Sequence, residues 1–64
     1  MLTDLQLKLF VLKMLKLRGF TKNEANKWFN FNYSFHREIY RYYNHREILN
    51  ILKNLARTEK YRER

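Results

Sequence analysis

Residues 15–24 have the sequence LKLRGFTKNE, and this stretch, which holds the only glycine of the chain, decides how the fold begins. The segment before Gly19 is rich in Leu, Lys and Met, and the apolar Phe20 follows, which is typical of a helix closed by a left-handed glycine cap. We therefore predict a helix over residues 2–18. The alternation of leucine with polar residues over 5–9 also fits a strand, but leucine in place of β-branched residues favours the helix.

A second helix is predicted to start directly after Thr21. Thr21 and Glu24 have the spacing of a capping box, in which each side chain accepts a hydrogen bond from the backbone amide of the other. Ala25, Trp28 and Phe29 recur at the spacing of one helix face, so we expect them to face the core.

A turn and a third helix are expected next. Residues 30–34 are polar and aromatic without periodicity, which predicts a turn, with Ser34 as the cap of a helix over residues 34–43. The apolar arc of this helix should contain Phe35, Ile39, Tyr42 and Tyr43.

A fourth helix is predicted over residues 45–60. Asn44 and Glu47 repeat the capping-box spacing, so the chain should break at Asn44. A continuous helix is the alternative, but it would bring Arg46 close to the apolar arc, which favours the break. The tail over residues 59–64, which includes the end of this helix, is expected to fray. The buried face of the fourth helix should contain Ile48, Ile51, Leu52, Leu55 and Ala56.

The composition limits both the fold and the partner. With 64 residues the chain is one small domain, and the absence of cysteine excludes disulfides and thiolate metal sites. Because 45% of the residues are hydrophobic, we expect an all-α domain of three to four short helices rather than disorder. Lys and Arg number 14 against 6 Asp and Glu, and the resulting charge of +8 favours a polyanionic partner.

Membranes are not an expected partner. Lysines interrupt the leucines of the first predicted helix, so no secretory signal and no transmembrane span is predicted, and the expected location is the cytoplasm. The same helix lacks the single polar face that a helix lying on a membrane surface needs.

The first predicted helix is apolar on nearly every side. Two or three short helices of the same chain can cover only part of that surface, so a second copy of the chain is the simplest cover for the rest. A monomer that wraps this helix completely is the alternative. We predict a homodimer with an interface that includes Leu5, Leu9, Phe10 and Leu12.

A candidate nucleic-acid-binding face lies on the predicted helix over residues 34–43. Arg37 and Arg41 lie one turn apart and can bridge to phosphate or to a guanine edge, while Asn44 can pair with adenine. A solvent-exposed polar face without a partner is the alternative interpretation. The predicted face contains His36, Arg37, Tyr40, Arg41 and Asn44.

Further cations are candidates for contacts with the phosphate backbone. A basic stripe on the predicted fourth helix falls within roughly 60° around its axis. Lys22 and Asn23 at the start of the second helix are expected to hold phosphates as well. We interpret the basic residues of the first helix, Lys8, Lys13, Lys16 and Arg18, mainly as solubilising side chains. The basic stripe contains Arg46, Lys53, Arg57 and Lys60.

The order of features over residues 20–43 is similar to the helix-turn-helix motif of DNA-binding proteins. A capped helix with a small buried residue at its fifth position, Ala25, precedes a turn and an Arg-bearing helix. The turn departs from the motif because Phe29 and Asn30 stand where a glycine and an apolar residue are expected. The resemblance implies that the second of these helices would enter the major groove.

No catalytic or cofactor site is predicted. His36 and His45 are nine residues apart, which places them on opposite sides of a continuous helix and prevents chelation of one metal ion. Ser34 and Asp4 are the only serine and aspartate, and no Gly-rich phosphate loop is present. We expect a binding protein rather than an enzyme.

The leading functional hypothesis is a small dimeric DNA-binding regulator of a phage, virus or plasmid. Its affinity for DNA would depend strongly on salt, because each neutralised phosphate releases counterion. One alternative is an interaction or inhibitor protein that binds an acidic host protein. A further alternative is binding to RNA or the ribosome.

Overall fold

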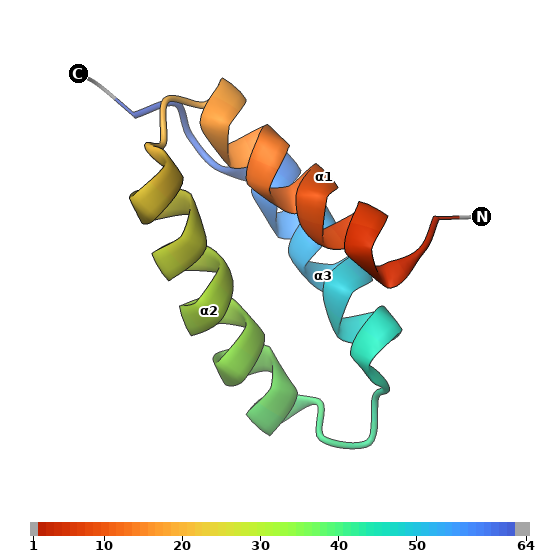
Figure 1. Cartoon of the computed structure of the whole chain (residues 1–64). Coiled ribbons are helices and arrows are strands. Elements are labelled where there is room, and N and C mark those ends of the chain that lie inside the picture. Colours follow the sequence, from red (N-terminus) through yellow and green to blue (C-terminus); the bar gives the residue numbers. More distant parts are fainter. Residues whose placement is uncertain (1, 63–64) are drawn as a thin grey trace.

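The computed structural model describes residues 2–62, and this part of the chain forms three α-helices: α1 (Asp4–Leu17), α2 (Lys22–Ile39) and α3 (His45–Thr58). Figure 1 shows α1 and α3 side by side and running in the same direction, with α2 in the opposite direction. The described range contains no strand, so the all-α prediction is confirmed and the strand alternative for residues 5–9 is wrong.

Hydrogen bonds close both ends of α1. Thr3 and Gln6 form a capping box, with donor to acceptor distances of 3.1 and 2.8 Å. At the other end Gly19 has a φ of +92°, and the amides of Gly19 and Phe20 donate to carbonyls of the last turn at 3.0 and 3.1 Å. This pair of bonds defines a Schellman motif, so the predicted glycine cap is confirmed.

The predicted turn over residues 30–34 is wrong, because α2 continues through it and Ser34 lies inside the helix. The start of α2 carries the predicted capping box. Neither proline nor glycine interrupts the segment, and Phe29 and Tyr33 stack one turn apart with ring centroids 6.0 Å from each other. Contacts at this spacing stabilise a helix.

The continuity of α2 changes which residues face the core. Ala25 and Phe29 are buried as predicted, and Trp28 is partly buried. At about 100° per residue the same face then reaches Tyr33 and His36, both partly buried, rather than the predicted apolar arc. That prediction is wrong, and the exposed fractions of its members are Phe35 49%, Ile39 55%, Tyr42 90% and Tyr43 43%.

The break before α3 is confirmed, and the continuous helix is wrong. Asn44 caps α3 by accepting a hydrogen bond from the amide of Glu47 at 2.9 Å. The helix ends at Thr58, two residues before the predicted end. Its predicted core face is buried or partly buried, and Leu49, which we did not predict, is fully buried as well.

One face of each helix contributes to a single core. Leu7, Val11 and Leu15 follow one another at four-residue spacing along α1 and are each at most 1% exposed. Every buried residue of the described range is hydrophobic. The other buried residues are Phe20, Ala25, Phe29, Ile48, Leu49, Leu52 and Ala56.

One end of the bundle, here called the tail end, consists of residues 18–24 and 57–62. Arg18 donates its Nε to the carbonyl of Glu59 at 2.9 Å and its Nη2 to the carbonyl of Arg57. A guanidinium at the last carbonyls of α3 satisfies acceptors that have no partner within the helix. The prediction that Arg18 mainly solubilises the chain is therefore wrong.

The chain after α3 follows the tail end closely. The amide of Arg62 donates to the carbonyl of Arg18 at 2.7 Å, and its guanidinium lies 3.2 Å from the carboxylate of Glu24. The indole of Trp28 donates to the carboxylate of Glu59 at 3.1 Å. We expected this tail to fray; its described part instead makes these contacts, and its last two residues lie outside the described range.

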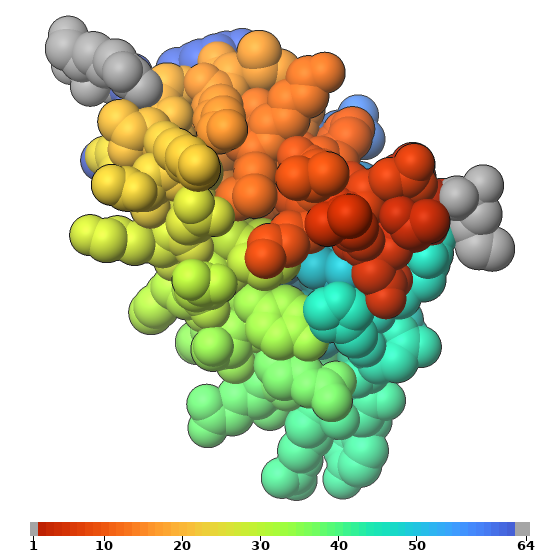
Figure 2. Space-filling view, viewed as in Figure 1, coloured from red at the N-terminus to blue at the C-terminus, as the bar shows by residue number. Residues whose placement is uncertain are grey.

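The opposite end, here called the aromatic end, consists of residues 31–46. α2 has 18 residues against 14 in each of the other helices, which makes it about 6 Å longer at 1.5 Å per residue. In Figure 2 the green end of α2 and the loop that follows it form the lower tip of the molecule, below α1. The last turns of α2 extend past α1, so helices cover them on some sides only.

Candidate nucleic-acid interface

The predicted nucleic-acid-binding residues lie at both ends of the bundle and along α3. Lys22 and Asn23 are exposed in the first turn of α2, at the tail end. Arg37 lies 15 residues further along the same helix, about 22 Å away. One short stretch of nucleic acid backbone cannot contact both groups, so the structure does not bring the whole predicted set together.

Arg37 and Arg41 lie together at the aromatic end and are both exposed. Arg37 donates Nη1 to the carbonyl of Tyr43 at 2.6 Å, which uses one of its five N–H donors. The guanidinium of Arg41 lies 5.5 Å from the centre of the Tyr42 ring. Neither arginine makes an ion pair within the described range.

The other predicted residues of this face make contacts within the protein. The Nδ1 of His36 lies 2.8 Å from the carbonyl of Asn32, and Tyr40 ends α2 while its ring stacks on His36. The carbonyl oxygen of the Asn44 side chain accepts the cap hydrogen bond of α3. Two-point pairing with adenine uses the same oxygen, so Asn44 would have to share it between the cap of α3 and the base.

A row of cations follows one face of α3. Arg46, Lys53 and Arg57 are spaced by seven and four residues, so they fall within roughly 40° around the helix axis. Arg46 lies 3.6 Å from the carboxylate of Asp4, whereas Lys53 and Arg57 make no ion pair among the described residues. Lys60 follows the end of α3, so it does not continue the row as a helical residue.

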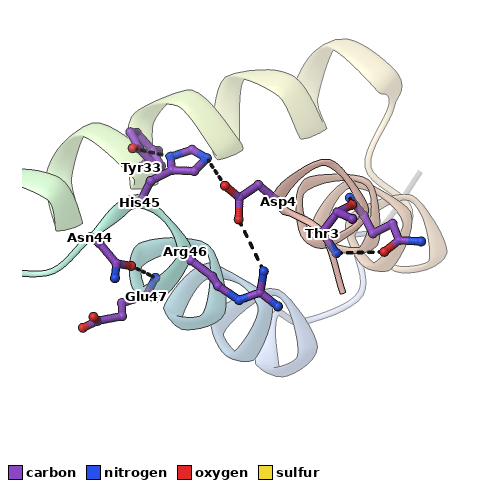
Figure 3. Close-up of polar contacts among 8 residues, drawn as sticks. Thr3, Asp4, Tyr33, Asn44, His45, Arg46 and Glu47 are labelled. Carbon is purple, nitrogen blue, oxygen red and sulfur yellow. Dashed lines mark hydrogen bonds and ion pairs between the residues drawn. The ribbon is translucent and has the colours of Figure 1, made fainter. Parts of the chain in front are cut away.

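Contacts around His45 join the three helices and were not predicted. Figure 3 shows His45 of α3 between Tyr33 of α2 and Asp4 of α1. The Tyr33 hydroxyl lies 2.7 Å from Nδ1 of His45, and Nε2 lies 4.0 Å from the Asp4 carboxylate. The side chains of His45 and Asp4 are 53% and 52% exposed, so the contacts among Tyr33, His45 and Asp4 lie at the surface. They position the first turn of α3. Residues up to 41 positions apart in the sequence meet here, so helix periodicity offered no signal for the contact.

The aromatic residues at the end of α2 are a second feature that the sequence analysis missed. Phe31 is 70% exposed, and its ring is stacked on Phe35 with centroids 6.3 Å apart and 5° between the planes. Their four-residue spacing is a signal for one helix face, but only if the helix runs through residues 30–34.

The residues of the predicted dimer interface differ in exposure. Leu5 and Leu9 are 65% and 53% exposed, on the outer side of α1. Phe10 is partly buried, and Leu12 packs against the core.

Comparison of the chain with protein-family models, with curated proteins and with solved structures finds no match. Within the described range, no helix is long and apolar enough to cross a membrane. The same range contains no group of three or more His, Cys, Asp or Glu side chains that could hold a metal ion.

Proposed function

We propose that this chain is a small basic DNA-binding protein that holds the phosphate backbone along α3. The observation that carries the proposal is the row of Arg46, Lys53 and Arg57, of which the last two have no carboxylate partner among the described residues. Along the helix axis, Lys53 and Arg57 are about 6 Å apart. Arg37 and Arg41 at the aromatic end supply two further cations.

The charge of the whole chain supports this proposal. A net charge of +8 on 64 residues favours a polyanion, and the counterions released from each neutralised phosphate add to the affinity. The proposed role is transcription regulation of the kind found in phages, viruses and plasmids. Selection of bound sequences from random duplexes tests that role directly.

The decisive experiment is a titration of fluorescent duplex DNA at several salt concentrations with two charge-matched variants. Lys53→Gln/Arg57→Gln removes two cations from the row on α3. We expect it to weaken binding at low salt about 10- to 100-fold and to reduce the slope of log affinity against log salt by about 2, because each lost phosphate contact contributes about 0.9.

The control variant is Lys13→Gln/Lys27→Gln, which removes one exposed cation from α1 and one from α2 and leaves the row on α3 intact. Its net charge equals that of the test variant. Equal loss of affinity in both variants would mean that only the total charge matters, and it would contradict the assignment to α3. Circular dichroism melts of both variants establish that the fold is intact.

We also propose a homodimer in which the outer side of α1 meets its copy. Leu5, Leu9 and Leu12 follow one another on α1 at spacings of four and three residues, which is the spacing of a helix-pairing seam. Leu2, Leu5 and Leu9 are between 42% and 65% exposed, so they are accessible to a partner. We expect light scattering to give twice the mass of the chain, and Leu5→Lys/Leu9→Lys to give a monomer. A wild-type monomer at high protein concentration would contradict the proposal.

Binding to an acidic host protein is the second candidate function. Exposed aromatic residues at the aromatic end favour it, because aromatics and arginines are enriched among residues that dominate protein interfaces. Wild-type protein that binds no nucleic acid at low salt, but forms a stoichiometric complex with a purified acidic protein, would support this candidate.

A further inference from the structure

The aromatic end exposes several aromatic rings to solvent. The exposed fraction is 70% for Phe31, 49% for Phe35 and 90% for Tyr42. The Phe31 and Phe35 rings are parallel within 5°. Tyr40 and Tyr43 extend the group, with ring centroids 5.1 Å apart.

These rings lie among cations. Residues 31–46 contain three arginines and two histidines but a single carboxylate, that of Glu38. Of the three arginines, Arg46 is paired with Asp4 of α1, so the arginines without an ion pair among the described residues here are Arg37 and Arg41. Arg41 already stacks its guanidinium against Tyr42 at 5.5 Å, and Arg37 is exposed one turn before it. A group of exposed rings with an excess of cations fits a ligand that combines flat aromatic groups with negative charge.

We propose that the aromatic end binds unpaired bases of a single-stranded nucleic acid, which stack on Phe31, Phe35 and Tyr42 while Arg37 and Arg41 hold the adjacent phosphates. Proteins that bind single strands without sequence preference combine stacking on aromatic side chains with a positively charged surface along the backbone. The proposal rests on the proposed function, since it names the form of nucleic acid that this end of the molecule takes.

Charge complementarity favours a nucleic acid over a protein at this surface. A single strand presents one phosphate for each base, so it matches both the exposed rings and the arginines beside them, whereas an acidic protein surface offers carboxylates to the arginines but no regular series of flat rings. The side-chain amide oxygen of Asn44 already accepts the cap hydrogen bond and His36 contacts a backbone carbonyl, while Arg37 and Arg41 are assigned to the phosphates. We therefore expect stacking that tolerates any base sequence.

The test compares fluorescent oligothymidine of 12 nucleotides with an abasic strand of the same length, which carries the same phosphates without bases. We expect wild-type protein to bind oligothymidine at least tenfold more tightly than the abasic strand. Phe31→Ser/Tyr42→Ser should remove most of that difference, since each base stacked on an aromatic ring contributes about tenfold. Binding of the double variant to the abasic strand should be unchanged.

A matched control replaces two other large residues that are more than half exposed and lie outside the aromatic end. Leu17 and Tyr61 are 61% and 74% exposed, and Leu17→Ser/Tyr61→Ser should bind both strands like the wild type. Equal wild-type affinity for the two strands, or full retention of oligothymidine binding by Phe31→Ser/Tyr42→Ser, would overturn the proposal and leave this surface to a protein partner. The proposed function fails separately, if Lys53→Gln/Arg57→Gln leaves duplex binding unchanged.

Discussion

The two ends of the bundle use similar residues in opposite ways. At the tail end, the guanidinium of Arg18 bonds to the end of α3, and that of Arg62 pairs with Glu24 and lies 4.8 Å from the centre of the Phe20 ring. At the aromatic end, Arg37 and Arg41 make no ion pair among the described residues, and the rings beside them are exposed. Arg18 and Arg62 at the first end therefore stabilise the fold, whereas Arg37 and Arg41 and the exposed rings beside them at the second end are accessible to a ligand. Residue type alone does not distinguish these roles.

The largest loss of stability is expected from a substitution at the tail end, Gly19→Ala. Its φ of +92° strains any L-residue, and an added Cβ would lie 2.9 Å from the carbonyl oxygen of Arg62. We expect a cost of about 2 kcal/mol, from αL strain of about 1 kcal/mol and displacement of the tail. Thermal denaturation would show this as a melting temperature lowered by about 10 °C.

A D-alanine at the same position provides the control, because a D-residue adopts positive φ without strain. Chemical synthesis of a chain of 64 residues makes this variant accessible. If the L-alanine and D-alanine variants have the same melting temperature as the wild type, the Schellman motif does not hold this end as proposed.

Arg18→Met should have the next largest effect. Methionine keeps part of the apolar stem but removes two hydrogen bonds to carbonyls at the end of α3, along with the contact of the guanidinium with Tyr61. We expect a loss of about 1 to 2 kcal/mol in urea denaturation, since hydrogen bonds from charged groups contribute roughly that much.

Arg18→Lys distinguishes geometry from charge in this contact. Lysine retains the charge near the C-terminus of α3 but cannot donate two bonds from a planar fork. Stability equal to the wild type in Arg18→Lys would mean that charge alone accounts for the contribution of Arg18.

The contrast between the ends also explains what the sequence could predict. The glycine cap, the caps at Thr21 and Asn44 and most of the α3 core face depend on residues within one or two turns of each other, and they were predicted correctly. The contact between Arg18 and α3 joins residues 41 positions apart, which no local pattern encodes.

At the aromatic end the error was one of periodicity. The many Asn, Phe and Tyr residues over 30–34 hide the helical repeat, because the residues facing the core there are polar or only partly apolar, such as Tyr33 and His36. An expected turn shifted the apolar arc, so Phe35 and Ile39 were assigned to the core although they are exposed. The arginines of the candidate site were identified from residue type, but the exposed rings beside them required the continuous helix.

Asn44→Ala tests the one cap at the aromatic end and should have a smaller effect. It removes the hydrogen bond to the Glu47 amide and should cost about 1 kcal/mol. Asn44→Asp, which can cap equally well, should retain the stability of the wild type. Because Asn44 is assigned to the cap and not to base reading, Asn44→Asp should also leave sequence preference in DNA binding unchanged, and a changed preference would contradict that assignment.

Substitutions of the exposed rings should have the smallest effect on stability. Phe31 is 70% exposed and contacts mainly Phe35, so Phe31→Ser removes little buried area, and we expect a change in the free energy of unfolding within about 0.5 kcal/mol. Urea denaturation, monitored by circular dichroism, measures this change in the free energy of unfolding. A loss above about 1 kcal/mol would mean that the ring is covered in solution, either by the rest of the chain or by a second copy. A loss that shrinks on dilution would identify the second copy, because dilution dissociates a wild-type dimer and removes its advantage over the variant. If stability is unchanged, the Phe31 ring does not contribute to the fold and remains accessible to a ligand. The two ends would then differ in function as they do in contacts.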